Sequence, residues 1–134
     1  MQLELFSSAE MIYMKVYGDV SAESVHRWTA VSGKHYTNQA VVLMDLRELV
    51  SVSISVPDFT SRGLQEKQGL KPVQNVKIAY VAGADLIYGF ARVIETVWQD
   101  IVQVGVFRTM PEATEWLGIK DSSFDHLELL VREP

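Results

Sequence analysis

Tyr88 and Arg92 are the residues of this sequence best suited to binding a charged group. They stand four positions apart, so on a helix they share a face and can present a phenol and a guanidinium to an anionic group. The candidate ligand site is Tyr88-Gly89 together with Arg92. A structural alternative competes with it, because Arg92 can stack on the tyrosine ring or pair with Glu95, and Gly89 can simply let another backbone approach closely.

Asp45 and a run of serines are the next candidates. Asp45 closes an apolar run and has the chemistry of a general base or a ligand contact at a strand end, but an aspartate there also commonly caps the next turn. Ser51, Ser53 and Ser55 lie just before a predicted helix start, where phosphorylation would change what docks. Ser53 and Ser55 are therefore candidate phosphorylation sites, although surface serines are common.

Several other chemistries lack the residues they need. The three histidines, His26, His35 and His126, are far apart, and none has a second ligand at helical spacing, so no metal is expected. No serine sits in a nucleophile elbow, and the chain has no cysteine. The turn around Gly83 offers one glycine where a dinucleotide site offers three. We expect no cofactor and no catalysis.

The composition predicts a folded domain that does not bind nucleic acid. The 134 residues and 15.1 kDa suit one domain, and 48% hydrophobic with 22% charged residues is an ordinary globular mixture. A net charge of −5 without a basic cluster opposes binding to a phosphate backbone. No apolar run approaches the ~20 residues that cross a bilayer, and the acidic start is unlike a signal peptide. We expect a soluble, cytoplasmic protein.

The chain alternates between short β-rich runs and longer helical ones. The predicted strands are 3–6, 11–17, 40–46, 76–82 and 103–108, the first two forming an N-terminal hairpin. The predicted helices are 22–35, 57–68, 85–102 and 111–117. Their expected end signals are an N-cap at Ser21, a left-handed C-cap at Gly69, an N-cap at Asp85 and a stop at Gly118.

These elements predict a mixed, mostly parallel α/β sheet of about five strands with about four packing helices. The whole chain, 1–134, forms one domain in this interpretation, with 120–134 as a C-terminal extension. That extension is too apolar to be free. A short helix, an edge strand on this sheet and a strand exchanged with a second subunit all remain open, and the apolar tail favours a homodimer. Ligands of such sheets bind beyond the carboxyl ends of the strands.

Three segments in order resemble the SpoIIAA-like family, whose fold is shared with STAS domains and with CRAL-TRIO lipid-transfer proteins. They are 42–47, then 78–81 leading into 87–92, and finally 106–108 through 112–118. The resemblance covers most of the chain from Met11 to Ile119. It implies a STAS-like mixed sheet, a bacterial cytosolic protein and a binding or regulatory role in place of catalysis.

One motif of the related anti-sigma-factor antagonists is missing. Those proteins carry an Asp-Ser-Ser-Gly phosphorylation motif, and this sequence has Ser53-Ile54-Ser55-Val56 at about that place. The position that best matches the phospho-acceptor is Ile54, which has no hydroxyl. Ser53 and Ser55 remain as substitutes.

Two functions from different classes follow. The first is a non-catalytic module that binds a small amphipathic or lipid-like ligand at the carboxyl edge of the sheet, with Tyr88 and Arg92 holding its polar head. The second is a protein-interaction module of the anti-sigma-factor-antagonist type, with a degenerate phosphorylation motif, which docks a regulatory protein or a second copy through 51–57.

Overall fold

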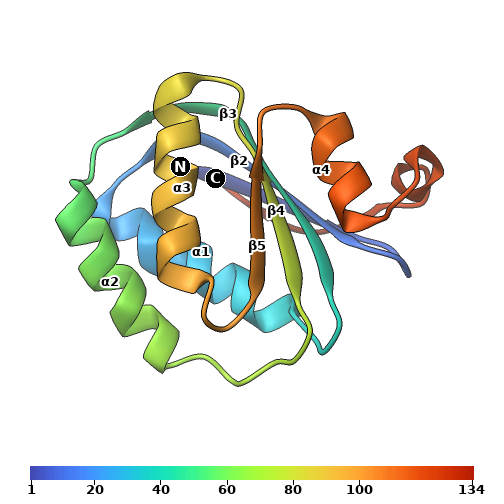
Figure 1. Cartoon of the computed structure of the whole chain (residues 1–134). Helices are drawn as coiled ribbons and strands as arrows, with labels where there is room; N and C mark the ends of the chain where they lie inside the picture. The colour runs from blue at the N-terminus through green and yellow to red at the C-terminus, as the bar shows by residue number, and fades with distance from the viewer.

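The computed structural model describes every residue from Met1 to Pro134 and contains one sheet of six strands in the order β5-β4-β3-β2-β1-β6 (Figure 1). The strands are β1 (Gln2–Ser7), β2 (Ile12–Val20), β3 (Val41–Val52), β4 (Lys77–Val81), β5 (Gln103–Phe107) and β6 (Glu128–Glu133). The helices are α1 (Ala22–His35), α2 (Val56–Gln68), α3 (Asp85–Trp98) and α4 (Met110–Leu117), with a short 3₁₀ helix at Asp121–Phe124.

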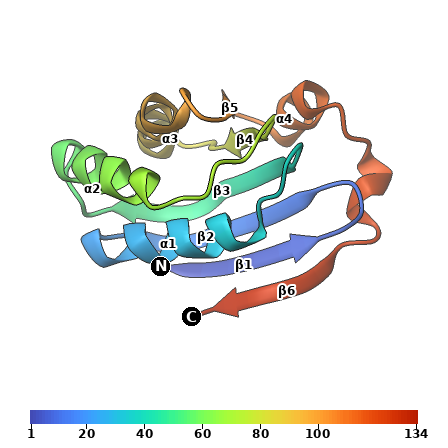
Figure 2. The same cartoon turned by 90° about the horizontal axis from the view of Figure 1, so that it is seen from below.

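The sheet is mostly parallel, as expected from the alternation of strands and helices. Strands β2, β3, β4 and β5 pair in parallel, and each is joined to the next by a helix. β1 pairs antiparallel with β2 on one side and with β6 on the other. The predicted mixed α/β class and the N-terminal hairpin are confirmed. The sheet has six strands and not five because the C-terminal extension adds β6 beside β1 (Figure 2).

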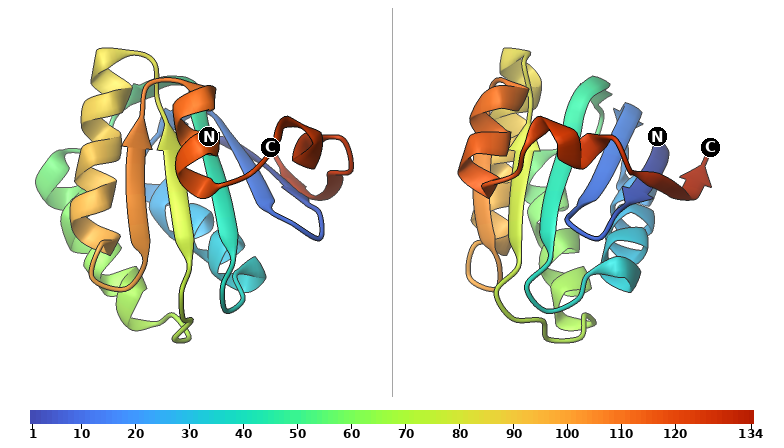
Figure 3. Two further views of the ribbon diagram at one scale, coloured as in Figure 1. Left: turned by 45° about the vertical axis from the view of Figure 1, so that its right-hand side comes forward. Right: turned by 90° about the vertical axis from the view of Figure 1, so that its right-hand side faces the viewer.

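The two faces of the sheet are covered unequally. Helices α1, α2 and α3 pack side by side, and α4 lies on the opposite face, where it contacts β3, β4 and β5 (Figure 3, left). The larger apolar core lies under α1–α3, and a smaller one that includes Leu43, Ala79 and Ala113 lies under α4. The ligand-sized space described below therefore falls within the larger of two cores.

Local capping explains where several helices begin and end. The Ser55 hydroxyl accepts a bond from the Asp58 N–H at 3.2 Å, and Thr109 does the same for Glu112 at 3.4 Å. Gly118 ends α4 in the left-handed conformation, with φ of 73°, as predicted.

Two predicted end signals are wrong. The Gly69 backbone is right-handed, with φ of −89°, because α2 ends with bonds from the Gly69 N–H to the last-turn carbonyls and needs no left-handed residue. Ala84, not Asp85, is the N-cap of α3. The Asp85 carboxylate instead accepts a bond from Arg108 at 2.7 Å. Asp85 therefore forms an ion pair and does not form the helix cap that the sequence predicted.

Two element boundaries also differ from the predicted ones. β3 runs on to Val52, well past the predicted end at residue 46, because its second half pairs with the second half of β2. Asp45 is thus in the middle of β3 and not at a strand end. The longest predicted helix ends at Trp98 and not near 102.

The C-terminal segment is held to the rest of the molecule by both backbone and side-chain bonds. β6 pairs with β1 from Glu128 to Glu133, with one irregularity at Leu5/Phe6. Arg27 of α1 donates to the backbone carbonyls of Met1 and Pro134, so the two ends of the chain lie side by side (Figure 2). Of the three arrangements left open for this segment, the structure has the edge strand. None of the helices combines the length and the apolar character that crossing a bilayer requires.

Candidate functional site

A largely apolar cavity of about 420 Å³ lies between the three helices α1, α2 and α3 and the sheet. Thirteen of its twenty lining residues are hydrophobic. Met44 of β3 and Ile78 and Tyr80 of β4 form its floor, since these side chains share the sheet face that the three helices cover. Phe59 of α2 and Ile94 of α3 face them from the helix layer.

The cavity lies toward the amino ends of the central strands. The segments that lead into β3, β4 and β5 all line it, namely Tyr36, residues 70–73 and residues 101–102. The sequence predicted a ligand site beyond the carboxyl ends of these strands. The apolar space lies instead near the opposite edge of the sheet.

Two glycines let the backbone close around this space. A Cβ on Gly33 of α1 would stand 2.8 Å from Leu70, in the loop that follows α2. A Cβ on Gly63 of α2 would stand 3.0 Å from Val97 of α3. Both distances are below ordinary van der Waals contact, so a larger residue would displace the end of the Leu70 side chain at Gly33 and would press on Val97 of α3 at Gly63.

Four hydroxyl-bearing residues, Thr29, Ser32, Tyr36 and Tyr80, line the cavity, and the Thr29 hydroxyl donates to the Val25 carbonyl of its own helix at 2.9 Å. Burial raises the pKa of the Tyr80 phenol well above its ordinary value, and the neighbouring Tyr36 raises it further. Burial also raises the pKa of Tyr36 to about 12, although the Ser32 side chain acts in the opposite direction. Both phenols are therefore neutral hydrogen-bond donors at physiological pH.

Two lysines line the cavity as well. Lys67 of α2 is largely buried, and its ammonium donates to the Val97 carbonyl at 3.0 Å and to the Asp100 carboxylate at 2.9 Å. Lys71 lies in the exposed loop after α2. The positive charge of Lys67 is thus paired within the protein, whereas Lys71 is at the solvent-exposed rim.

The predicted Tyr88, Gly89 and Arg92 group does not line the cavity. Arg92 pairs with Glu95 at 3.1 Å, which is the structural alternative weighed for it. The Tyr88 ring lies beneath the guanidinium of Arg108, 4.0 Å from the ring centre. A Cβ on Gly89 would meet nothing within 4 Å, so no backbone approaches closely there. A role for these residues in ligand binding stays a prediction.

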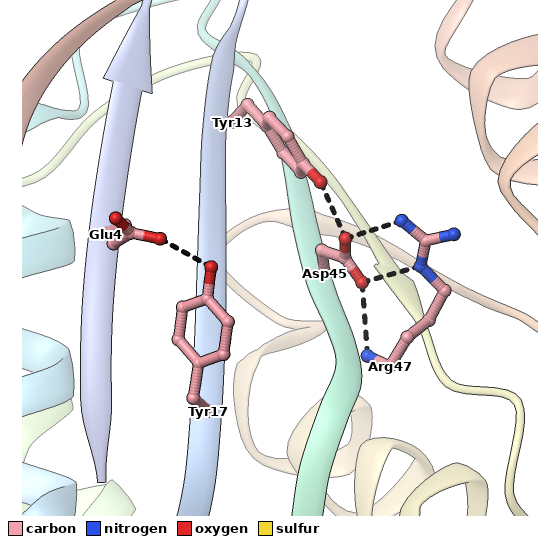
Figure 4. Close-up of polar contacts among 5 residues, drawn as sticks. All are labelled: Glu4, Tyr13, Tyr17, Asp45 and Arg47. Atoms are coloured by element: carbon pink, nitrogen blue, oxygen red, sulfur yellow. Dashed lines mark hydrogen bonds and ion pairs between the residues drawn. The ribbon is translucent and has the colours of Figure 1, made fainter.

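Asp45 lies in a hydrogen-bonded cluster on the α4 face of the sheet (Figure 4). Its carboxylate accepts bonds from the Tyr13 hydroxyl at 2.6 Å and from two guanidinium nitrogens of Arg47 at 2.9 and 2.8 Å. Burial opposes ionisation of Asp45, but the bonds from Arg47 and Tyr13 outweigh it and hold the pKa of this carboxyl below its ordinary value. Asp45 is therefore a saturated anion and a poor proton acceptor.

A second polar pair flanks this cluster. The Tyr17 hydroxyl of β2 donates to the Glu4 carboxylate of β1 (Figure 4). Arg132 of β6 donates to the same carboxylate at 2.8 Å. These bonds tie β6, β1 and β2 together on the sheet face that also carries the Asp45 cluster.

The two candidate phosphorylation sites, Ser53 and Ser55, have different surroundings in the structure. The Ser53 hydroxyl donates to the Asp19 carboxylate at 2.6 Å, as does Ser51. A phosphate on Ser53 would stand against that carboxylate and be repelled. Ser55 instead caps α2, where the helix dipole favours negative charge. Of the two, Ser55 is the position that accommodates a phosphate.

The mixed, mostly parallel sheet with its four helices has the architecture of a SpoIIAA-like fold. The chain is similar to the crystal structure of an uncharacterised protein of the DUF3478 family from Shewanella loihica PV-4, which has a SpoIIAA-like fold. The two share 20% sequence identity over 86% of this chain and 91% of the other, with a TM-score of 0.52. No family model and no curated protein matches this sequence. At this identity the likeness establishes the fold.

Sequence reasoning missed Tyr36, Tyr80 and Arg108. Tyr80 carried a usable signal, because it is a phenol inside the otherwise apolar strand 78–81. Tyr36 and Arg108 carried none, since each follows a regular element and gains its role only from a partner distant in the sequence.

Proposed function

We propose that this protein is a non-catalytic binding module that takes a small amphipathic or lipid-like ligand into the cavity between α1, α2, α3 and the sheet. The observation that carries the proposal is the cavity itself, at about 420 Å³ and mostly apolar. Ligand sites in proteins commonly measure 300–1,000 Å³ and combine apolar walls with a few polar groups. Here Tyr36, Tyr80 and Ser32 supply the polar groups.

Packing supports a ligand at this place. Interiors are close-packed, and voids larger than a water molecule are few. An apolar molecule in the cavity would restore the contacts that side chains such as Phe59 and Ile94 lack on one side. Burial of its apolar surface would then contribute roughly 25 cal/mol per Å² to binding, before the entropic cost of association.

Binding without catalysis agrees with the state of Asp45. A general base needs a free lone pair and a pKa near neutrality. The Asp45 carboxylate is bonded to Tyr13 and Arg47, and its pKa is held low. A regulatory role, in which ligand occupancy changes what the module docks, is the function that we assign to it.

The test is the binding of N-phenyl-1-naphthylamine, an uncharged apolar fluorophore. Two variants are compared, each with a single valine replaced by phenylalanine. Val73 lines the cavity, and Val50 is 79% exposed outside it. We expect fluorescence enhancement with the unmodified protein and with Val50→Phe, and at least a tenfold loss of affinity with Val73→Phe. Circular dichroism melts confirm that both variants are folded. Equal binding by Val73→Phe and Val50→Phe would exclude the cavity as the site.

A second candidate function is protein docking through the segment around Ser55. Val50 and Val56 flank this segment and are 79% and 55% exposed, respectively. Exposed apolar side chains beside a serine that can carry phosphate suit a regulatory partner. The test is co-purification from the native host with Val56→Asp, and with Leu64→Asp on the same helix as control. A partner lost only in Val56→Asp supports docking, and no partner in any sample opposes it.

A further inference from the structure

We infer that the cavity selects an uncharged amphiphile with a hydrogen-bond acceptor, such as a ketone, ester or amide carbonyl, and that this group points inward to Tyr80 and Tyr36. The inference rests on the proposed function and adds the chemical class of the ligand and its orientation. It is carried by the Tyr80 hydroxyl, which belongs to a buried residue, is accessible from the cavity that this residue lines, and makes no hydrogen bond to another group of the protein.

Tyr80 is 5% exposed and lies in the middle of the sheet, between β3 and β5. Its side chain lines the cavity, and only burial and the neighbouring Tyr36 influence its phenol. A neutral phenol that opens onto an apolar cavity is free to donate a hydrogen bond to an acceptor on a molecule in that cavity.

Tyr36 places a second phenol near the first. It follows α1 and lines the same cavity, with Ser32 of the preceding turn beside it. One carbonyl oxygen has two lone pairs and can accept from two donors. Either phenol can therefore donate to an acceptor atom of a ligand in this cavity, and a hydrocarbon has no such atom.

The same surroundings disfavour an anion inside the cavity. The ammonium of Lys67 is already bonded to Asp100 and to the Val97 carbonyl, and Lys71 is in the exposed rim. A carboxylate placed at the tyrosines would be buried without a free cation beside it, and burial of an unpaired charge is unfavourable. An anionic ligand would have to lie the other way round, with its charge at Lys71.

Three naphthalenes of matched shape test the acceptor and its charge. They are 2-acetylnaphthalene, 2-ethylnaphthalene and 2-naphthoate, which is ionised at neutral pH. Affinities are measured by calorimetry or fluorescence for the unmodified protein, Tyr80→Phe and Tyr36→Phe. Tyr17→Phe is the matched control, because Tyr17 is outside the cavity and its hydroxyl bonds to Glu4.

We expect the ketone to bind most tightly and to lose about tenfold in affinity with Tyr80→Phe, the effect of one hydrogen bond to a buried donor. Tyr36→Phe should lower ketone affinity in the same direction. The hydrocarbon should bind Tyr80→Phe as well as or better than the unmodified protein, since the substitution removes an unpaired hydroxyl. Naphthoate should bind at least tenfold more weakly than the ketone, and Tyr17→Phe should leave all three affinities unchanged.

The outcomes separate this inference from the proposed function. If all three compounds bind but Tyr80→Phe leaves the preference for the ketone unchanged, the cavity binds ligands. The inference that the acceptor group of the ligand points inward to Tyr80 is then wrong. Tightest binding by naphthoate, lost with Lys71→Ala, would likewise overturn it in favour of an outward anion. If none of the three binds, the proposed function fails together with the inference.

Discussion

Asp45 is a charged side chain with only 1% of its surface exposed, so its bonds must compensate for lost hydration. The Arg47 guanidinium and the Tyr13 hydroxyl supply those bonds, and they favour the ionised carboxylate. We predict that Asp45→Asn lowers the free energy of unfolding by about 2 kcal/mol at pH 7, the typical contribution of hydrogen bonds to a buried charge. Urea denaturation measures this loss.

The loss of stability caused by Asp45→Asn should become smaller as the pH falls. The pKa of Asp45 in the folded protein is lowered from its ordinary value of 3.8. The stabilisation is therefore fully present above that ordinary value and is lost as the pH falls through the folded-state pKa. The difference in the free energy of unfolding between the unmodified protein and Asp45→Asn should therefore narrow only as the pH falls below the ordinary pKa of 3.8. A gap that stays constant would mean that Asp45 is not held ionised by this cluster.

At the scale of one element, Ser55 tests whether α2 depends on its cap. Its hydroxyl accepts from the Asp58 N–H, so Ser55→Ala should cost about 1 kcal/mol of stability. Ser55→Asp should retain most of the stability, because aspartate is an equally good cap. Ser53→Ala is the neighbouring control, since Ser53 bonds to Asp19 outside the helix. Equal losses in Ser55→Ala and Ser55→Asp would contradict the capping role.

Gly89 and Gly118 give opposite predictions for the same substitution. Neither position would place a Cβ within 4 Å of another atom, but Gly118 has φ of 73° and Gly89 is in helical backbone. Gly89→Ala should therefore stabilise the fold by about 1 kcal/mol, and Gly118→Ala should destabilise it by about 1 kcal/mol. Thermal melts measure both. A loss of N-phenyl-1-naphthylamine binding in Gly89→Ala would instead restore the ligand role predicted for this residue.

For the whole molecule, the position of the C-terminal strand distinguishes a monomer that pairs β6 with its own β1 from a dimer that exchanges β6 between two copies. β6 pairs with β1 of its own chain, and Arg27 donates to the Pro134 carbonyl. We predict that protection of the β6 amides from hydrogen exchange is independent of protein concentration over a hundredfold range. Protection that rises with concentration would indicate strand exchange between two copies, because such an exchange depends on mass action.

The element pattern was largely predictable from the sequence. Buried strands at the centre of a parallel sheet are continuous apolar runs, and Ser21, Pro57 and Gly118 are local signals that act within a few residues. The predictions failed where a distant partner intervened. Asp85 bonds to Arg108, 23 positions away, in place of capping its own helix. β3 continues to Val52 because β2 pairs with it, which no periodicity in 46–52 indicated.

The site depended on tertiary structure to a greater extent. Tyr88 and Arg92 share a helix face, as their spacing predicts, yet each has a partner that the pair alone did not identify, Arg108 for one and Glu95 for the other. The cavity is lined from three helices, two strands and the segments that precede β3, β4 and β5. The volume of the cavity depends on how far apart the helices and strands lie and on how much of the space between them the side chains fill. No single position in the sequence encodes either quantity.

The sequence by itself determined the class of this protein: a mixed sheet, mostly parallel, with helices joining its strands, because hydrophobic periodicity and end signals act over short distances. Only the tertiary structure decided that the C-terminal segment is a sixth strand, that Asp45 is bonded to Tyr13 and Arg47, and that Tyr80 faces an apolar cavity without a partner. Each of these depends on residues that are distant in the chain and meet only when the helices pack on the sheet.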